Sequence, residues 1–235
     1  MKNILKRYAS KIQIELTDDQ LDKFQKYYDA LIETNKVMNL TAITEVNDVV
    51  TKHFVDSLSL INYFDLKDKA VIDVGTGAGF PGIPLAILLE NTQFTLMDSL
   101  NKRINFLNNV IEICNLKNVT TIHSRAEDLG RNEDYREKYD VCVSRAVANM
   151  STLLEYCIPF VKKGGYFISY KSGNAEEEIN NSVAAQKKLS CINKKTIDFT
   201  LEGTDMFRSF VIFEKTGELS KKYPRQAGKP KKSPL

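Results

Sequence analysis

The sequence predicts an α/β protein with a doubly wound, mostly parallel sheet of seven strands, which ends in an antiparallel strand and follows a small helical N-terminal region. Two observations predict this architecture. From residue 69 onward, short apolar runs alternate with segments of helical length, as in parallel strands joined by crossover helices. Near the C-terminus, two strand-like runs are separated by a short polar segment without room for a helix, so they are expected to pair antiparallel.

The helical region is expected over residues 1–65, where the alternation typical of strands is missing. Thr17 and Gln20 have the spacing of a capping box, which predicts a helix over residues 18–36. Its core-facing side is expected to carry Leu21, Phe24, Tyr28 and Leu31. A second helix is expected to begin near Asn47, whose side chain can cap a helix.

The sheet domain is expected over residues 66–220, and helical segments separate its first five strands. Because parallel strands end at one edge of the sheet, ligands of such folds bind outside the carboxyl ends of the strands. The predicted strands cover residues 70–74, 94–98, 119–123, 139–146, 165–171, 194–201 and 209–215.

Composition narrows the class of protein. The chain has 235 residues, 43% of them hydrophobic, so it can bury one large core. It lacks an apolar run of the roughly 18 residues that a membrane helix needs, and it lacks a cleavable signal, so a cytoplasmic protein is expected. A monomer is the expected oligomeric state. The cysteines are widely spaced and form no C-x-x-C pair, which predicts reduced core thiols rather than disulfides or a metal site. They are Cys114, Cys142, Cys157 and Cys191.

Positive charge is concentrated in the C-terminal tail, residues 221–235. This tail carries six Lys or Arg and no acid, so subtracting its charges from the net +3 leaves −3 for residues 1–220. Its three prolines and one glycine predict that it forms no helix. Two interpretations stay open, a solvated terminus and an arm that contacts phosphate. The candidate phosphate-binding cations are Lys221, Lys222, Arg225, Lys229, Lys231 and Lys232.

The strongest signal is the segment "VIDVGTGAGFPGIP" over residues 71–84, in which four glycines directly follow the first predicted strand. A tight turn between a strand and a helix needs one or two glycines, so a closely approaching ligand is the better explanation. Asp73 lies near the end of the strand, and Gly75, Gly77 and Gly79 begin the loop.

Two cofactors fit this loop. Gly77 to Gly82 satisfies the dinucleotide pattern G-x-G-x-x-G, with Asp98 near the distance expected for a ribose-binding acid. The fuller pattern D-x-G-x-G-x-G favours S-adenosylmethionine, because the carboxylate of Asp73 suits a cationic ammonium and sulfonium better than a pyrophosphate.

Polar residues after successive strands complete the predicted cofactor pocket. Asp98 is expected to accept hydrogen bonds from the ribose hydroxyls, and Ala126 and Glu127 are expected to lie at the adenine edge. Phe80 is expected to close over the cofactor. The alternatives are that Asp98 only caps the following helix and that Glu127 is a simple surface acid.

Several motifs occur in one order along the chain: "NLTAITE", "KHFVDSL", "VIDVGTGAGFPGIPLAI", "DSLNKRINFL", "RAED", "SRAVA" and the terminal "KKYPR" and "GKPKKSPL". In these motifs the chain resembles, from about residue 20 to its C-terminus, the bacterial glucose-inhibited division protein B (RsmG) family of small-subunit ribosomal RNA methyltransferases. The resemblance implies a Rossmann-like, class I S-adenosylmethionine-dependent methyltransferase that methylates N7 of one guanine in 16S rRNA of the 30S subunit. The family's cofactor contacts fall on Gly75, Phe80, Ala126, Glu127 and Arg145, with the Asp98 region also lining the pocket.

The implied reaction makes modest demands on side chains. Guanine N7 already carries an in-plane lone pair, so its methylation needs no general base and can depend on proximity and alignment. Arg145 and Lys171, each at the end of a predicted strand, are the candidates that position the base or a phosphate, and Arg208 extends this path. Ordinary ion pairing is the alternative for all three. His53 and Asp56 either approach the pocket or are structural.

Two other functions stay open from the sequence. One is a nicotinamide-dependent oxidoreductase that uses the Gly77 to Gly82 pattern, and the other is a non-catalytic ribosome-assembly factor with the same fold. Asp73 and the lack of a separate substrate domain disfavour the oxidoreductase. The intact cofactor loop disfavours the assembly factor.

Overall fold

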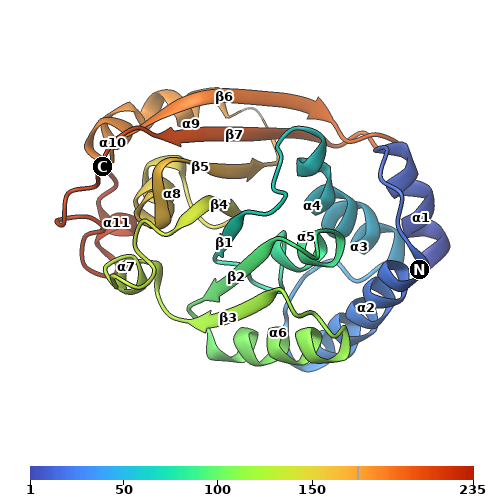
Figure 1. Ribbon diagram of the computed structural model, residues 1–235. Coiled ribbons are helices and arrows are strands. Elements are labelled where there is room, and N and C mark those ends of the chain that lie inside the picture. The colour runs from blue at the N-terminus through green and yellow to red at the C-terminus, as the bar shows by residue number, and fades with distance from the viewer. Residues whose placement is uncertain (174) are drawn as a thin grey trace.

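The computed structural model describes residues 1–173 and 175–235, and a seven-stranded sheet lies at its centre (Figure 1). The strands are β1 (Ala70–Val74), β2 (Gln93–Asp98), β3 (Val119–His123), β4 (Tyr139–Arg145), β5 (Val161–Lys171), β6 (Cys191–Thr200) and β7 (Phe207–Lys215). Their order is β3-β2-β1-β4-β5-β7-β6, and β7 runs antiparallel to both of its neighbours while the first five strands pair in parallel. The predicted fold class is confirmed, including the antiparallel pair at the end.

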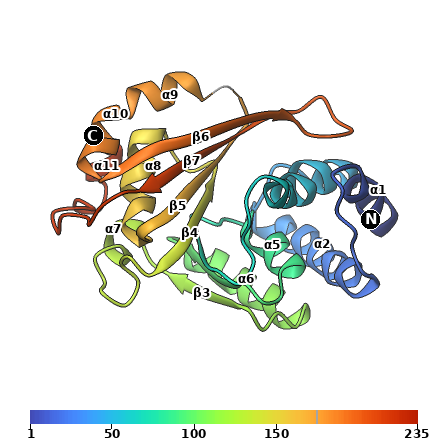
Figure 2. The same ribbon diagram turned by 45° about the horizontal axis from the view of Figure 1, so that its top comes forward.

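Helices cover both faces of the sheet. They are α1 (Lys2–Lys11), α2 (Asp18–Met38), α3 (Val46–Val49), η1 (Val50–Val55), α4 (Asp56–Leu58), η2 (Ser59–Asn62), α5 (Gly82–Leu88), α6 (Asn101–Ile113), α7 (Ala126–Leu129), α8 (Met150–Cys157), η3 (Ile158–Phe160), α9 (Glu176–Asn181), α10 (Val183–Lys188) and α11 (Lys229–Lys232). Helices α1 to α6 lie on one face, and α7 to α11 lie on the other (Figure 2).

The central strands send side chains alternately into two cores, one under each layer of helices. In β1, Val71 belongs to the core beneath α1 to α6, whereas Ile72 and Val74 belong to the core beneath α7 to α11. Burial on both faces explains why the central strands read as continuous apolar runs. The N-terminal helices share the first core with the sheet, since Phe24 and Phe54 are fully buried in it.

Helix α2 begins as the sequence predicts. Thr17 accepts a hydrogen bond from the Gln20 amide at 3.2 Å, and the Gln20 side chain accepts one from the Thr17 amide at 3.0 Å. The predicted buried face needs one correction, because Tyr27 is fully buried and Tyr28 only partly. The Tyr27 hydroxyl donates to the Ala78 carbonyl in the glycine loop at 2.5 Å, so a tertiary partner selects it over its neighbour.

The prediction that Asn47 caps the second helix is wrong. Glu45 is the N-cap residue, with the extended backbone that a cap needs (φ −64°, ψ 133°), and Asn47 lies inside α3. The chain then continues as the π-helical segment η1, a geometry that often occurs at functional sites. The Lys52 carbonyl in this segment accepts a hydrogen bond from Arg145 at 3.0 Å, which ties η1 to the end of β4.

The prediction that the tail forms no helix is also wrong over four residues. Helix α11 has Pro230 in its first turn and Gly228 as its N-cap at φ 80°. Proline is tolerated there because first-turn amides have no partner within the helix, and glycine adopts the left-handed backbone without strain. Tyr223, Pro224 and Pro230 are buried, so this part of the tail packs on the domain.

All four cysteines are free and buried, which confirms the prediction of core thiols. Burial raises the pKa of the Cys114 thiol to about 11 and that of Cys191 to about 12, so both stay protonated near neutral pH. Within the described part of the chain, the helices are too short or too polar to cross a membrane.

Replacing Thr17 by Ala is expected to lower the free energy of unfolding by about 1 kcal/mol, because the Gln20 amide loses its acceptor at the start of α2. Denaturant unfolding followed by circular dichroism measures this change. Thr17→Ser keeps the hydroxyl and is the matched control, so it should unfold like the wild type. An equal loss of stability in both variants would contradict the capping role.

Candidate active site

A buried carboxylate holds the loop between β1 and α5 from below. Asp73 is fully buried, and its Oδ2 accepts hydrogen bonds from the Thr76 hydroxyl at 2.7 Å and the Gly82 amide at 2.9 Å. Three glycines of the loop have φ between 62° and 103°, so the chain turns back over Asp73 through left-handed conformations. The two hydrogen bonds therefore fix the start and the end of the loop on one carboxylate oxygen.

Packing explains two of the loop glycines. A Cβ atom at Gly82 would lie 2.9 Å from Asp73 Oδ2, and one at Gly79 would lie 2.8 Å from the Tyr27 hydroxyl. At Gly77 a Cβ would meet no atom within 4 Å, and there the positive φ selects glycine. The loop glycines thus serve close packing inside the protein as well as the approach of a ligand.

Burial raises the pKa of the Asp73 carboxyl to about 7, although the hydrogen bonds from Thr76 and Gly82 favour its charged form. Its Oδ1 is buried and has no hydrogen-bond partner among the described residues. A nearby cation stabilises such a carboxylate, and S-adenosylmethionine carries two cationic groups, so the loop fits this cofactor. Asp73 itself lies beneath the loop and outside the wall of the cavity described next, and its direct contact with the cofactor stays a prediction.

A cavity of about 450 Å³ opens at the carboxyl ends of β1, β2 and β3. Four predicted cofactor residues line it, namely Gly75, Asp98, Ala126 and Glu127. Gly77, Gly79 and Phe80 lie outside its wall. The remaining wall residues are Val74, Met97, Ser99, Arg103, Ser124, Arg125, Ala146, Val147, Tyr156, Gly228 and Lys231. We call this space the cofactor cavity.

Asp98 joins the glycine loop to α6. Its Oδ2 accepts hydrogen bonds from the Gly77 amide at 3.0 Å and from Arg103 at 3.1 Å, and its Oδ1 accepts one from the Leu100 amide at 2.9 Å. The alternative that Asp98 only caps the following helix is wrong, because Leu100 is the N-cap of α6 and that helix has no side-chain cap hydrogen bond. Asp98 also lines the cofactor cavity, and its contact with the ribose hydroxyls stays a prediction.

Glu127 is a buried part of the cavity wall. Its exposed fraction is 6%, so the alternative that it is a simple surface acid is wrong. The Gly228 amide donates a hydrogen bond to its Oε1 at 2.8 Å. Tail and pocket meet at this carboxylate, which the sequence alone did not indicate.

A second cavity of about 450 Å³ lies beside the first, between η1 and the ends of β4, β5 and β7. Its wall contains Ile43, Lys52, His53, Asp56, Arg145, Ala146, Ala148, Leu153, Ser169, Tyr170, Lys171, Ser172, Glu178 and Arg208. Ala146 lines both cavities and has a left-handed backbone at φ 58°. The two spaces therefore adjoin at the end of β4, and we call the second one the acceptor cavity.

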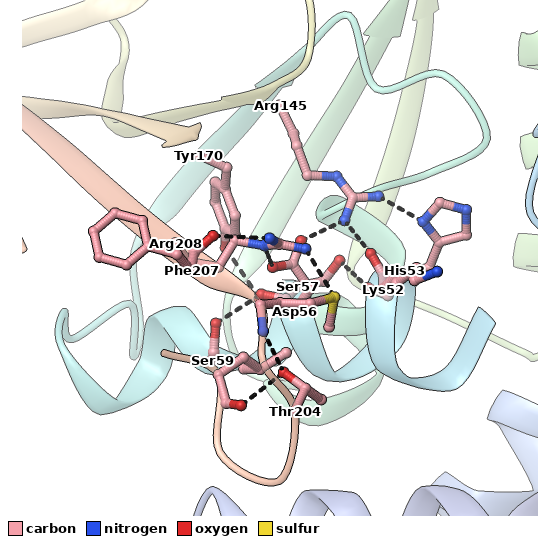
Figure 3. Close-up of polar contacts among 12 residues, drawn as sticks. Lys52, His53, Asp56, Ser57, Ser59, Arg145, Tyr170, Thr204, Phe207 and Arg208 are labelled. Carbon is pink, nitrogen blue, oxygen red and sulfur yellow. Dashed lines mark hydrogen bonds and ion pairs between the residues drawn. The ribbon is translucent and has the colours of Figure 1, made fainter. Parts of the chain in front are cut away.

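Asp56 organises the cations of the acceptor cavity (Figure 3). It is 4% exposed, and its two oxygens accept from different guanidinium groups, Arg145 at 2.8 Å and Arg208 at 2.6 Å. Since a buried carboxylate is costly unless it is paired, Asp56 holds both arginines tightly in place. The structure thus brings together three residues that the sequence singled out from segments far apart in the chain.

His53 lies in the same cluster and is neutral. Burial, reinforced by the charge of Arg145, lowers the pKa of His53 to about 3. Its Nδ1 therefore accepts from Arg145 at 3.2 Å, and its Nε2–H donates to the Thr41 hydroxyl at 2.9 Å. The ring stacks on Phe80 with 4.4 Å between centroids, and the Arg145 guanidinium lies 5.1 Å from the centre of the Phe80 ring. Phe80 thus packs against the acceptor side of the site.

Lys171 is ion-paired and still lines the acceptor cavity. Its Nζ lies 2.7 Å from Glu178 Oε2, an oxygen that also accepts a hydrogen bond from the Met150 amide at 3.0 Å. Among the candidate cations, Arg145, Lys171 and Arg208 are each both ion-paired and part of the cavity wall. The alternative of ordinary ion pairing is therefore correct for all three, and it does not remove them from the site.

The candidate cations of the tail are divided by the structure. Arg225 is bound to Glu155, a fully buried residue of α8 that the sequence analysis missed because it reads as part of an apolar helix. Lys231 lines the cofactor cavity. The other four are exposed, namely Lys221, Lys222, Lys229 and Lys232.

The fold and the glycine loop define the class of protein, which is a class I S-adenosylmethionine-dependent methyltransferase. Two solved structures have this fold in common with the chain. One is a SAM-dependent methyltransferase from Aquifex aeolicus, 17% identical with a TM-score of 0.55, covering 74% of this chain and 96% of that one. The other is TYW2 of M. jannaschii in complex with AdoMet, 15% identical with a TM-score of 0.54, covering 69% and 76%.

The chain belongs to the rRNA small subunit methyltransferase G (GidB) family, whose pattern matches residues 20–205. Proteins named ribosomal RNA small subunit methyltransferase G are similar over nearly the whole length. The one from Lachnoclostridium phytofermentans is 52% identical over 94% of this chain and 92% of its own. The one from Acetivibrio thermocellus is 47% identical over 100% and 97%. The resemblance noted in the sequence motifs is confirmed.

Asp73 predicts a particular dependence of stability on pH. Its pKa is about 7 in the folded protein against an ordinary value of 3.8, so between these values the folded state binds more protons than the unfolded state. Its contribution to the free energy of unfolding therefore falls as pH rises through this window, by on the order of 1 kcal/mol per pH unit.

Asp73→Asn, which keeps an oxygen that accepts from Thr76 and Gly82, is expected to remove this contribution. Denaturant unfolding of both proteins at several pH values between about 4 and 8 measures it. As pH rises, the free energy of unfolding of the wild type should fall relative to that of the variant. Parallel curves would contradict the raised pKa.

Proposed function

We propose that the protein transfers the methyl group of S-adenosylmethionine to N7 of a specific guanine in 16S rRNA, and that its substrate is the small ribosomal subunit or a precursor of it in the cytoplasm. The observation that carries this proposal is the pair of cavities that adjoin at Ala146, one beside the glycine loop and one lined by arginine and lysine. Membership of the methyltransferase G family supports the choice of substrate.

Four groups are proposed to hold the cofactor. Gly75 lets it approach the end of β1, Asp98 accepts hydrogen bonds from the ribose hydroxyls, and Ala126 and Glu127 contact the adenine. The buried charge of Asp73 below the loop favours a cationic ligand. When bound, the cofactor supplies an activated methyl group on sulfur.

The acceptor side is proposed to work by alignment. Guanine N7 needs no deprotonation, and the neutral His53 and paired Asp56 act as scaffold rather than as acid and base. The Arg145 guanidinium has five N–H donors, of which three have partners among the described residues. A further donor is proposed to contact guanine O6 or an adjacent phosphate, and Lys171 and Arg208 to bind the RNA backbone.

The two alternatives have less support. A nicotinamide-dependent oxidoreductase would place a pyrophosphate near Asp73, and the charged form of this carboxyl would repel it. A non-catalytic assembly factor would have no need of the cofactor cavity with Asp98 and Glu127 in its wall. Calorimetry with S-adenosylhomocysteine and with NAD separates the enzyme classes, since binding of NAD alone would end the proposal.

Incubation of 30S subunits and of naked 16S rRNA with S-adenosylmethionine carrying a labelled methyl group is expected to label 16S rRNA at one guanine. Reduction with borohydride followed by aniline should then cleave the chain at that guanine, as it does at N7-methylated residues. The low aromatic content and the lack of tryptophan suggest recognition of RNA shape, so the two substrates should react at unequal rates. Label on another atom or on a pyrimidine would contradict the proposal.

Arg208→Lys tests the acceptor cavity, because it keeps the charge and removes the fork that binds Asp56 and an RNA phosphate. The kcat/KM for RNA is expected to fall by one to two orders of magnitude, the range for charge-assisted hydrogen bonds. The affinity for S-adenosylhomocysteine should stay within about twofold. Lys194→Ala is the control, since Lys194 is exposed on β6 outside both cavities and pairs with Glu214. Equal losses in the two variants would contradict the assignment.

A further inference from the structure

The C-terminal segment reaches the cofactor cavity, although β7 delivers the chain to the other edge of the sheet. Because β7 is antiparallel to β5, it ends at the amino edge of the parallel strands. Residues 219–231, here called the strap, run from there along the layer of α7 and α8 to the carboxyl edge (Figures 1 and 2). There Gly228 and Lys231 lie in the wall of the cofactor cavity.

One buried ion pair anchors the strap. Glu155 on α8 is fully buried, and its two oxygens accept from the Arg225 guanidinium at 2.6 to 3.1 Å and from the Arg225 amide at 2.7 Å. Arg225 also donates to the Ser233 carbonyl at 2.8 Å. A buried carboxylate without a partner is strongly unfavourable, so docking of the strap satisfies a charge that the domain places inside itself.

Further side chains of the domain bind the backbone of the strap. Arg136 donates to the Tyr223 carbonyl at 2.8 Å and to the Leu219 carbonyl at 2.9 Å. Arg131 donates to the Pro224 carbonyl at 2.9 Å, and the Thr152 hydroxyl donates to the Pro230 carbonyl at 3.1 Å. Donors from two parts of the domain, the segment between α7 and β4 and helix α8, therefore fix the path of the strap up to the cavity.

The strap meets a cofactor residue directly, because the Gly228 amide donates to Glu127 Oε1 at 2.8 Å. We propose that the strap is a working part of the cofactor site, in which Arg225 anchors it, Gly228 orients Glu127 and Lys231 closes the wall. This inference rests on the proposed function in taking S-adenosylmethionine as the ligand. Cofactor binding and docking of the strap then stabilise each other, as any two linked equilibria do. Arg225 is thereby a structural residue that pairs with Glu155, and not a residue that binds an RNA phosphate.

The test uses Gly228→Val in the full-length protein. A β-branched residue does not tolerate φ 80°, so the strap must shift and the hydrogen bond to Glu127 is lost while the Arg225 anchor remains. The Kd for S-adenosylhomocysteine, measured by calorimetry, is expected to rise about tenfold. Gly164→Val is the matched control, because Gly164 also has φ 80° and open space around it but lies outside the cofactor cavity. The control should change the Kd by less than twofold.

A second variant ends the chain after Gln226, which keeps the pair of Arg225 and Glu155 and removes Gly228 and Lys231. Its affinity for S-adenosylhomocysteine should fall more than tenfold, and hydrogen exchange in the wild type should slow over residues 219–231 when the ligand is added. Wild-type affinity in both variants would overturn the role of the strap and leave the proposed function standing. A similar rise in Kd for Gly164→Val would show a general effect of stability, which also overturns it. Failure of the wild type to bind the ligand would overturn both proposals.

Discussion

The desolvated carboxylate of Asp73 is the constraint on which the site depends. Placing it at the end of β1 inside the sheet is unfavourable, as its pKa of about 7 shows, and the loop offsets part of that cost by turning its hydroxyl and amide donors inward. The turned loop leaves room for Tyr27, which donates to the Ala78 carbonyl and so joins the N-terminal helices to the cofactor site. Asp98, the last residue of β2, accepts a hydrogen bond from the Gly77 amide and so fixes the glycine loop to β2.

Three buried acids around the two cavities each join two parts of the chain that are distant in sequence. Asp56 joins α4 to β4 and β7, Glu127 joins α7 to the tail, and Glu155 joins α8 to the tail. Each acid is useful because leaving it unpaired in the interior would be costly, so its partner is held in one place. Apolar packing forms the two cores, and the buried ion pairs and hydrogen bonds then fix the positions of the side chains in the cavity walls.

The sequence predicted those features that are determined by residues close together in the chain. The capping box at Thr17 and the glycine loop have recognisable local patterns and are found where expected, and every predicted strand exists, although β5, β6 and β7 begin two to four residues earlier than predicted. The choice of Tyr27 over Tyr28, the helix in the tail and the pairing of Arg225 with Glu155 depend on contacts 51 to 101 residues away in the chain. A single sequence carries no signal for such pairs, so the tail read as free charge although part of it is bound.

The neutral state of His53 explains how the acceptor cavity keeps a concentrated positive charge. A protonated ring beside Arg145 would repel it, whereas the neutral ring presents a lone pair to the guanidinium and orients it. Asp56 balances part of this charge by pairing with Arg145 and Arg208. Under the proposed function, transfer to a nitrogen lone pair moves no proton, so such a site would gain more from fixed geometry than from titratable groups. The low pKa of His53 follows first from burial of the ring and second from the adjacent charge of Arg145.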